Sequence, residues 1–168
     1  MKRSASASAK TASQAAGEEE AKLDLEHFLP YRLSLLSNRV SAGIARCYRD
    51  RFGLSVTEWR IIAVLGHHPG LSGSELAART GMDKVAVHRA LRGLAARRLV
   101  IDRRPAGDRR RQYLHLSAAG RRLRARIVPL AVAYQNDLLA SVDSAGRRQL
   151  DHLLDRLLVR AGELLPRE

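Results

Sequence analysis

Residues 71–94 read LSGSELAARTGMDKVAVHRALRGL, and this stretch predicts two short helices joined by a tight turn. Ser72 and Glu75 have the spacing of a capping box, in which each side chain bonds a backbone N–H that the helix start leaves free. Gly81 falls where the chain must reverse, because a positive φ costs least at glycine. Asp83 then stands where it can cap the next helix. The stretch therefore predicts a helix-turn-helix.

The second of these helices, Lys84 to about Arg97, is predicted to have an apolar face and a basic face. Its apolar side chains recur at three- and four-residue steps, which places them on one side of a helix. They are Val87, Ala90, Leu91 and Leu94. The positions left on the other side are Lys84, His88, Arg89 and Arg92. We expect the apolar face to pack on the core and the basic face to point outward.

A β-hairpin with a basic tip is predicted to follow this helix. Short strands are expected at Leu99–Ile101 and Gln112–Leu116, with a charged loop, Arg103–Arg111, between them. A helix-turn-helix followed by a hairpin is the winged-helix arrangement. In that arrangement the second helix can enter the major groove of DNA, while the wing reaches the backbone or the adjacent minor groove.

Longer helices are predicted on both sides of this region. Their approximate ranges are 25–47, 57–66, 117–140 and 144–165. The first begins or is broken near Pro30, and Pro129 is expected to kink the third, because proline lacks the N–H that a helix needs. In the second, the inner face is predicted to be Trp59, Ile62 and Leu65. The expected fold class is mostly α with a small β-hairpin wing.

These patterns divide the chain into three regions. Residues 1–22 hold almost no large apolar side chain and are expected to form a disordered N-terminal tail. Residues 55–117 form the predicted winged helix-turn-helix lobe. Residues 23–54 and 118–166 form a predicted helical dimerisation region. A homodimer is expected because the apolar stripe Leu150, Leu153 and Leu157 would be left in water in a monomer.

The positive charge of the chain is concentrated in and after the helix-turn-helix. The formal net charge is +13 over 168 residues, and residues 84–126 hold fourteen Lys or Arg against two Asp. A field of one sign suits a polyanion such as double-stranded DNA. Two other interpretations stay open. One is a solvated Arg-rich surface, and the other is a nucleoid-associated or RNA-binding protein that uses the same charge without reading sequence.

Several classes of protein are disfavoured by the sequence. The histidines lack the spacing of metal ligands. No Ser/His/Asp or Cys/His set, phosphate-binding glycine loop or carboxylate pair stands out, so no metal, catalytic residue or enzymatic activity is expected. The single cysteine, Cys47, fits a reducing compartment. Because no segment has the pattern of a signal peptide or a membrane span, we expect a cytoplasmic protein.

The helix-turn-helix and its flanks resemble the MarR (multiple antibiotic resistance regulator) family of transcription regulators. The resemblance rests on the run from Leu76 to Leu94, on Leu99-Val100, on Asp102-Arg103-Arg104-Pro105 with Asp108-Arg109-Arg110, and on Leu116-Ser117 at a helix start. The stretch Thr57–Leu65 before His68-Pro69-Gly70 also fits. The likeness covers roughly Phe28 to Leu165.

This resemblance implies a dimeric, sequence-specific repressor that occludes a promoter by binding a pseudo-palindromic operator. By position, Asp108 would orient Arg109 and Arg110 toward the minor groove, where an arginine meets enhanced negative potential. The predicted DNA-binding residues are Ser72, Ser74, Lys84, Val85, Ala86, His88, Arg89, Arg92, Arg104, Asp108, Arg109 and Arg110.

The resemblance also implies a small aromatic or phenolic carboxylate as effector. The candidate effector-binding residues are His27, Tyr31 and Trp59, which offer a hydrogen bond and a flat apolar wall. A redox switch at Cys47 is the alternative, since some relatives carry a sensing thiol on the first helix. The apolar neighbours of Cys47 favour a buried, inert thiol instead.

Overall fold

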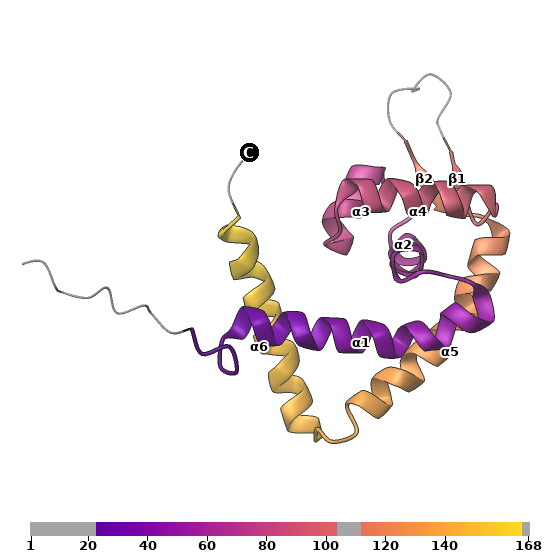
Figure 1. The fold of residues 1–168 in the computed structure, drawn as a ribbon. Coiled ribbons are helices and arrows are strands. Elements are labelled where there is room, and N and C mark those ends of the chain that lie inside the picture. The colour runs from indigo at the N-terminus through magenta and orange to yellow at the C-terminus, as the bar shows by residue number, and fades with distance from the viewer. Residues whose placement is uncertain (1–22, 104–111, 166–168) are drawn as a thin grey trace, which may run out of the picture. The chain divides into compact units, whose positions relative to one another are not determined.

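A computed structural model describes residues 23–103 and 112–165 of the chain (Figure 1). The chain divides between Asn38 and Arg39 into two units, each described by itself. In chain order the elements are α1 (Leu29–Phe52), α2 (Val56–His67), α3 (Gly73–Thr80), α4 (Lys84–Ala96), β1 (Val100–Asp102), β2 (Leu114–Leu116), α5 (Ala118–Leu138) and α6 (Ser144–Glu163). The prediction of a mostly helical fold with a two-stranded hairpin is confirmed.

Short polar side chains begin the helices of the second unit. Ser72 Oγ accepts from Glu75 N at 3.3 Å while the Glu75 carboxylate accepts from Ser72 N at 2.7 Å, so the predicted capping box is present. Side chains at the other helix starts are Ser55, Asp83, Ser117 and Asp143. Each satisfies a backbone N–H of the first turn, which fixes where the helix begins.

The core of the second unit is built around α2, which packs against α3, α4, α5 and β2. In Figure 1, α2 is seen end-on with α3 and α4 beside it. The predicted inner face, Trp59, Ile62 and Leu65, is buried, and so is Ile61, because neighbours cover α2 on several sides. The Trp59 ring lies 5.7 Å from the ring of Tyr48 of α1, centroid to centroid. Burial raises the pKa of the Tyr48 hydroxyl.

The hairpin is joined to the helix-turn-helix through β2. Strand β1 pairs antiparallel with β2 in the register Val100↔Leu116, Ile101↔His115 and Asp102↔Leu114. On its other edge, Leu114 N donates to Leu71 O at 3.0 Å and Leu114 O accepts from Gly70 N at 2.8 Å. Strand β2 therefore lies between β1 and the segment just before α3. It is shorter than predicted: beyond the pair Asp102↔Leu114, Arg103 N donates to Tyr113 O at 2.9 Å, and Tyr113 N donates to the Asp102 carboxylate at 3.0 Å.

Helix α5 leaves the base of the hairpin in close contact with the backbone. Ser117 N donates to Leu99 O at 3.0 Å, and Ser117 Oγ donates to Arg98 O at 2.7 Å. One turn later, Gly120 packs so tightly on the Leu99 carbonyl that a Cβ there would overlap its oxygen. The direction of α5 away from the lobe thus depends on a glycine at this position.

Two features of the remaining helices bear on function. Helix α6 contains no buried residue, and its leucines are exposed. The Cys47 side chain of α1 is half-buried, so it is not the buried core thiol that was predicted: the neighbouring Tyr48 and Ala45 take the inward positions. Within the described ranges, none of the helices has the length and apolar character needed to span a bilayer.

Gly120→Ala is expected to lower the free energy of unfolding. Overpacking against the Leu99 carbonyl costs about 1–3 kcal/mol, and the better helix propensity of alanine offsets about 1 kcal/mol of this. Urea denaturation followed by circular dichroism measures the difference. The matched control is Gly162→Ala in α6, where a Cβ meets nothing within 4 Å and stability should be unchanged or raised. Equal or higher stability of Gly120→Ala would contradict the packing described above.

Candidate nucleic-acid interface

Helix α4 buries one face and exposes the other, as its sequence predicts. Val87, Ala90 and Leu94 are buried, and Leu91 is half-buried. The exposed residues include Lys84, Val85, His88, Arg89 and Arg92, whereas Ala86 is half-buried. Val85 is 68% exposed, which is unusual for an apolar residue beside a core. The outer face of α4 therefore combines three cations, an imidazole and an apolar tip, all open to a partner.

The turn between α3 and α4 holds that face in place. Gly81 ends α3 in the left-handed conformation at φ +65°, and Met82 N then donates to Ala77 O at 3.2 Å. Two residues after Gly81, Asp83 caps the start of α4: its Oδ1 accepts from Ala86 N at 2.8 Å. Ala77 is buried where the two helices pack closely. These contacts are those of the predicted helix-turn-helix.

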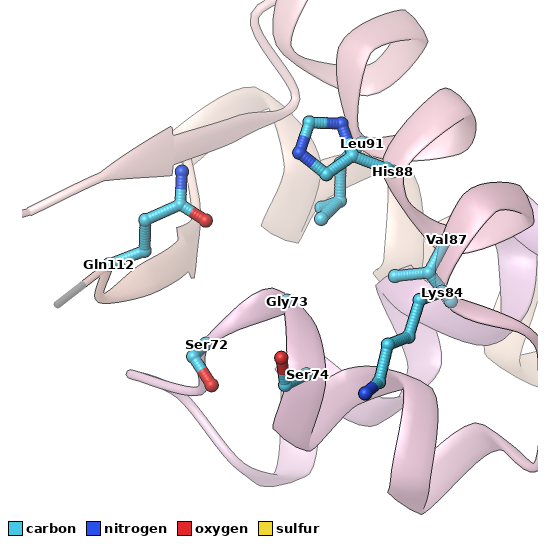
Figure 2. A pocket seen from close by; sticks show the side chains of 8 residues that line it. All are labelled: Ser72, Gly73, Ser74, Lys84, Val87, His88, Leu91 and Gln112. Atoms are coloured by element: carbon cyan, nitrogen blue, oxygen red, sulfur yellow. The ribbon is translucent and has the colours of Figure 1, made fainter.

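A cavity of about 570 Å³ lies where the start of α3, the outer face of α4 and the foot of the wing meet (Figure 2). Its lining residues are Ser72, Gly73, Ser74, Lys84, Val87, His88, Leu91 and Gln112. We call it the reading cavity. Lys84 and His88 reach it from α4, and Ser74 is exposed at the first turn of α3. The Ser72 hydroxyl is already bonded to Glu75, so its first role is to cap α3.

Gln112 is a candidate contact that the sequence analysis did not single out. Its amide faces the reading cavity from the strand side, opposite His88 and near Gly73 (Figure 2). Glutamine can donate and accept a hydrogen bond together, which matches the edge of adenine in the major groove. The sequence pattern predicts a strand here, and nothing in that pattern indicates a contact with DNA. Only the pairing of the hairpin brings it beside α3 and α4.

Other predicted site residues lie elsewhere in the chain. Arg104, Asp108, Arg109 and Arg110 fall outside the described residues. Of the effector candidates, His27 and Tyr31 belong to the first unit and Trp59 to the second. His27 is exposed, with Nδ1 2.7 Å from Asp24 Oδ2, and Tyr31 is exposed. Trp59 is 9% exposed, so little of its ring surface is open. No cluster of potential metal ligands occurs in the part of the chain described.

Comparison with known proteins shows which family this geometry resembles. A family model described as the MarR family matches residues 52–111. The structure also matches that of a MarR/EmrR family transcriptional regulator from Acinetobacter sp. ADP1, with a TM-score of 0.79 and 25% identity, over 84% of this chain and 100% of that one. In sequence over this segment, and in fold over most of its length, the chain is similar to MarR-family regulators.

Further transcription regulators are similar to this chain over most of their length. A putative transcriptional regulatory protein for the hcr operon of Thauera aromatica is 29% identical over 113 residues, which are 67% of this chain and 68% of the relative. Transcriptional repressor CouR, solved bound to a 23-mer DNA duplex, is 27% identical with a TM-score of 0.68, over 82% of this chain and 94% of that one. A MarR family protein of Mycobacterium tuberculosis was solved in complex with salicylic acid. It is 25% identical with a TM-score of 0.65, over 77% of this chain and 96% of that one. The present chain is thus similar to MarR-family transcription regulators and shares their winged-helix fold.

His88→Ala is expected to change which base is preferred at one position of the bound DNA. The imidazole lies at the reading cavity on the outer face of α4, and losing a base-reading side chain costs about 1–3 kcal/mol at the base pair concerned. Selection of bound sequences from a randomised duplex pool measures the preference. Arg122→Ala, which removes an exposed cation of α5 outside this cavity, should weaken binding to all sequences alike. An unchanged preference in His88→Ala would contradict its placement.

Proposed function

We propose that this protein is a sequence-specific repressor that binds a pseudo-palindromic operator as a homodimer and is released by a small aromatic acid. The observation that carries the proposal is the reading cavity between α3, α4 and Gln112, with cations beside it. Its polar groups suit base edges, and its cations suit phosphates.

Sequence reading is favoured over binding by charge alone because of the kinds of side chain on α4. A binder that only neutralises phosphates needs lysine and arginine. The outer face of α4 instead sets His88 and the exposed Val85 among the cations, and Gln112 faces the same cavity. An amide and an imidazole bond base edges, and an exposed aliphatic tip can contact the methyl group of thymine.

Homodimerisation is inferred from α6. Its apolar side chains are Leu150, Leu153, Leu154, Leu157, Leu158 and Val159, each at least 40% exposed. A contiguous apolar surface of this kind marks an interaction site in a protein that is otherwise charged. A second copy is the occupant with a matching surface, because a two-fold interface uses the same patch on both subunits. Two-fold symmetry then sets half-sites about 10 bp apart, one turn of DNA.

Repression and effector release are supported by similarity to two solved structures. CouR is a repressor bound to DNA, and the Mycobacterium tuberculosis protein binds salicylic acid. We infer that this chain acts on promoters in the cytoplasm, with His27, Tyr31 and Trp59 as candidate effector contacts. An effector lowers DNA affinity only by as much as it prefers the conformation that does not bind DNA.

A competition experiment tests sequence-specific binding. The full-length protein should stay bound to its own promoter duplex, followed by fluorescence anisotropy, in the presence of a hundredfold mass excess of unrelated duplex, since specific sites bind about 10³–10⁷ times more tightly. Release in proportion to the unrelated duplex would identify a nucleoid-associated or RNA-binding protein instead.

Peroxide treatment of the wild type and of Cys47→Ser tests the redox alternative. If peroxide releases the wild type from DNA and Cys47→Ser abolishes that release, a thiol switch replaces the aromatic acid as the signal.

A double substitution tests the proposed dimer. Leu153→Glu with Leu157→Glu places two carboxylates on the apolar face of α6 and is expected to give a monomer at micromolar concentration by light scattering. Gln149→Glu, on the same helix, adds a carboxylate without removing a leucine and should leave the dimer intact. A wild-type protein that is monomeric at this concentration would contradict the proposal.

A further inference from the structure

The corner between α1 and α2, at Phe52 and Gly53, is bonded by a side chain from the C-terminal end of α4. Arg97 Nη2 donates to Phe52 O at 2.8 Å, and Arg97 Nη1 donates to Gly53 O at 2.9 Å. Backbone acceptors at the C-terminal end of a helix have no partner within it, and the helix dipole attracts a cation there. One guanidinium thus satisfies two adjacent carbonyls at the end of α1. We call these two hydrogen bonds the corner contact.

The corner contact joins residues 44 and 45 positions apart in the chain. The last turn of α1 has basic residues of its own, Arg49 and Arg51, yet the bonds come from α4. The backbone N–H of Arg97 donates to Gly93 O at 3.1 Å and closes the last turn of α4. The backbone of Arg97 therefore belongs to the end of one helix, and its side chain holds the end of another.

Helix α5 meets the same corner. The guanidinium carbon of Arg126 lies 4.9 Å from the centroid of the Phe52 ring, which is a cation–π contact. Ile44 of α1 and Val128 of α5 line one apolar groove. Helix α5 leads to α6, whose exposed leucines carry the proposed dimer interface. The corner contact thus links α4 to the helices through which two copies of the chain are proposed to associate.

Packing on α2 and the corner contact act on different features of α4. Packing decides which face of α4 points outward, since Val87 and Leu94 are buried. The corner contact acts on the angle between α4 and α1. Helix α4 has 13 residues and is about 20 Å long, so a tilt of about 10° about its C-terminal end displaces its first residues by about 3.5 Å. Lys84 and His88, which reach the reading cavity, belong to that displaced half.

We propose that Arg97 is a positioning residue: by holding the end of α4 to the end of α1, it sets the distance between the two α4 helices of the dimer. That distance decides which spacing of half-sites the protein selects. The inference rests on the proposed function, a homodimer on a pseudo-palindromic operator. One added base pair moves a half-site by about 3.4 Å and rotates it by about a tenth of a turn. A tilt of the size given above is therefore enough to change the accepted spacing.

Selection from duplex pools tests the inference with the full-length protein. A first, randomised pool gives the half-site that wild type prefers, and a second pool keeps two such half-sites and varies the spacer between them. Wild type should prefer one spacer at least about tenfold over spacers two base pairs longer or shorter. Arg97→Met removes every donor of the corner contact and should reduce that ratio to about threefold or less, with the preferred bases within each half-site unchanged.

Arg98→Met is the matched control. It removes the same charge from the next exposed residue, whose side chain takes no part in the corner contact, and it should keep the wild-type spacer preference. A measurement without DNA complements the selection. A spin label at Arg89→Cys, in a Cys47→Ser background, reports the distance between the two α4 helices by double electron–electron resonance. The distance distribution should be narrow in the parent dimer and broader when Arg97→Met is added.

The outcomes separate a positioning role from other roles of an arginine. The inference is overturned if Arg97→Met keeps the wild-type spacer preference and the narrow distribution, even where urea denaturation shows a loss of stability. It is also overturned if Arg98→Met relaxes the spacing equally, or if Arg97→Met flattens the salt dependence of binding with the spacing unchanged, as for a phosphate contact. A wild type that selects no half-site would refute the proposed function instead, and the distance measurement would then decide the role of Arg97.

Discussion

Burial of α2 is the constraint on which the rest of the second unit depends. Ile61, Ile62 and Leu65 are almost fully removed from water, and α3, α4, β2 and α5 all pack against this helix. Burying one such side chain contributes about 1.5–3 kcal/mol. Rotating α4 about its axis by a quarter turn would expose Val87 and Leu94 and bring Lys84 and Arg92 toward the core. Such a rotation would greatly destabilise the folded state. The orientation of the basic face is therefore a consequence of packing on α2.

Strand β2 is the second structural constraint, because it joins parts of the lobe that are far apart in the sequence. Backbone bonds link Leu114 to Leu71 on one edge, and the ladder links it to Asp102 on the other. The loop before α3, the hairpin and the start of α5 are thus tied together within a few residues. A displacement at one of them is transmitted to the others through hydrogen bonds. Gln112, two residues before this strand, lines the reading cavity, and His115 and Leu116 of the strand line a second cavity at the base of the wing.

Helix α6 contrasts with the winged lobe. Its sequence has the apolar period of a packed helix, yet it has no buried residue in the isolated chain. Such a helix is stable only when its apolar face finds a partner, because propensity alone seldom stabilises about 20 residues in water. The lobe satisfies its own core, whereas α6 requires another surface. That difference separates the winged lobe, which forms a core of its own, from α6, whose exposed leucines carry the proposed dimer interface.

The sequence by itself determined the elements whose signals are local. The Ser72 and Glu75 spacing, the cap at Asp83, the reversal at Gly81 and the two faces of α4 all depend on residues a few positions apart, so they were predictable. The order of helices and hairpin, and with it the family resemblance, followed from the same patterns.

The tertiary structure alone decided which distant residues meet. Gln112 faces His88 only because β2 pairs with the segment before α3, and Arg124 crosses Gly66 only because α5 packs on α2. The half-buried state of Cys47 likewise depends on which side of α1 packs against the core. These contacts join residues some tens of positions apart. They are set by how whole elements pack, a property that no local spacing in the sequence encodes.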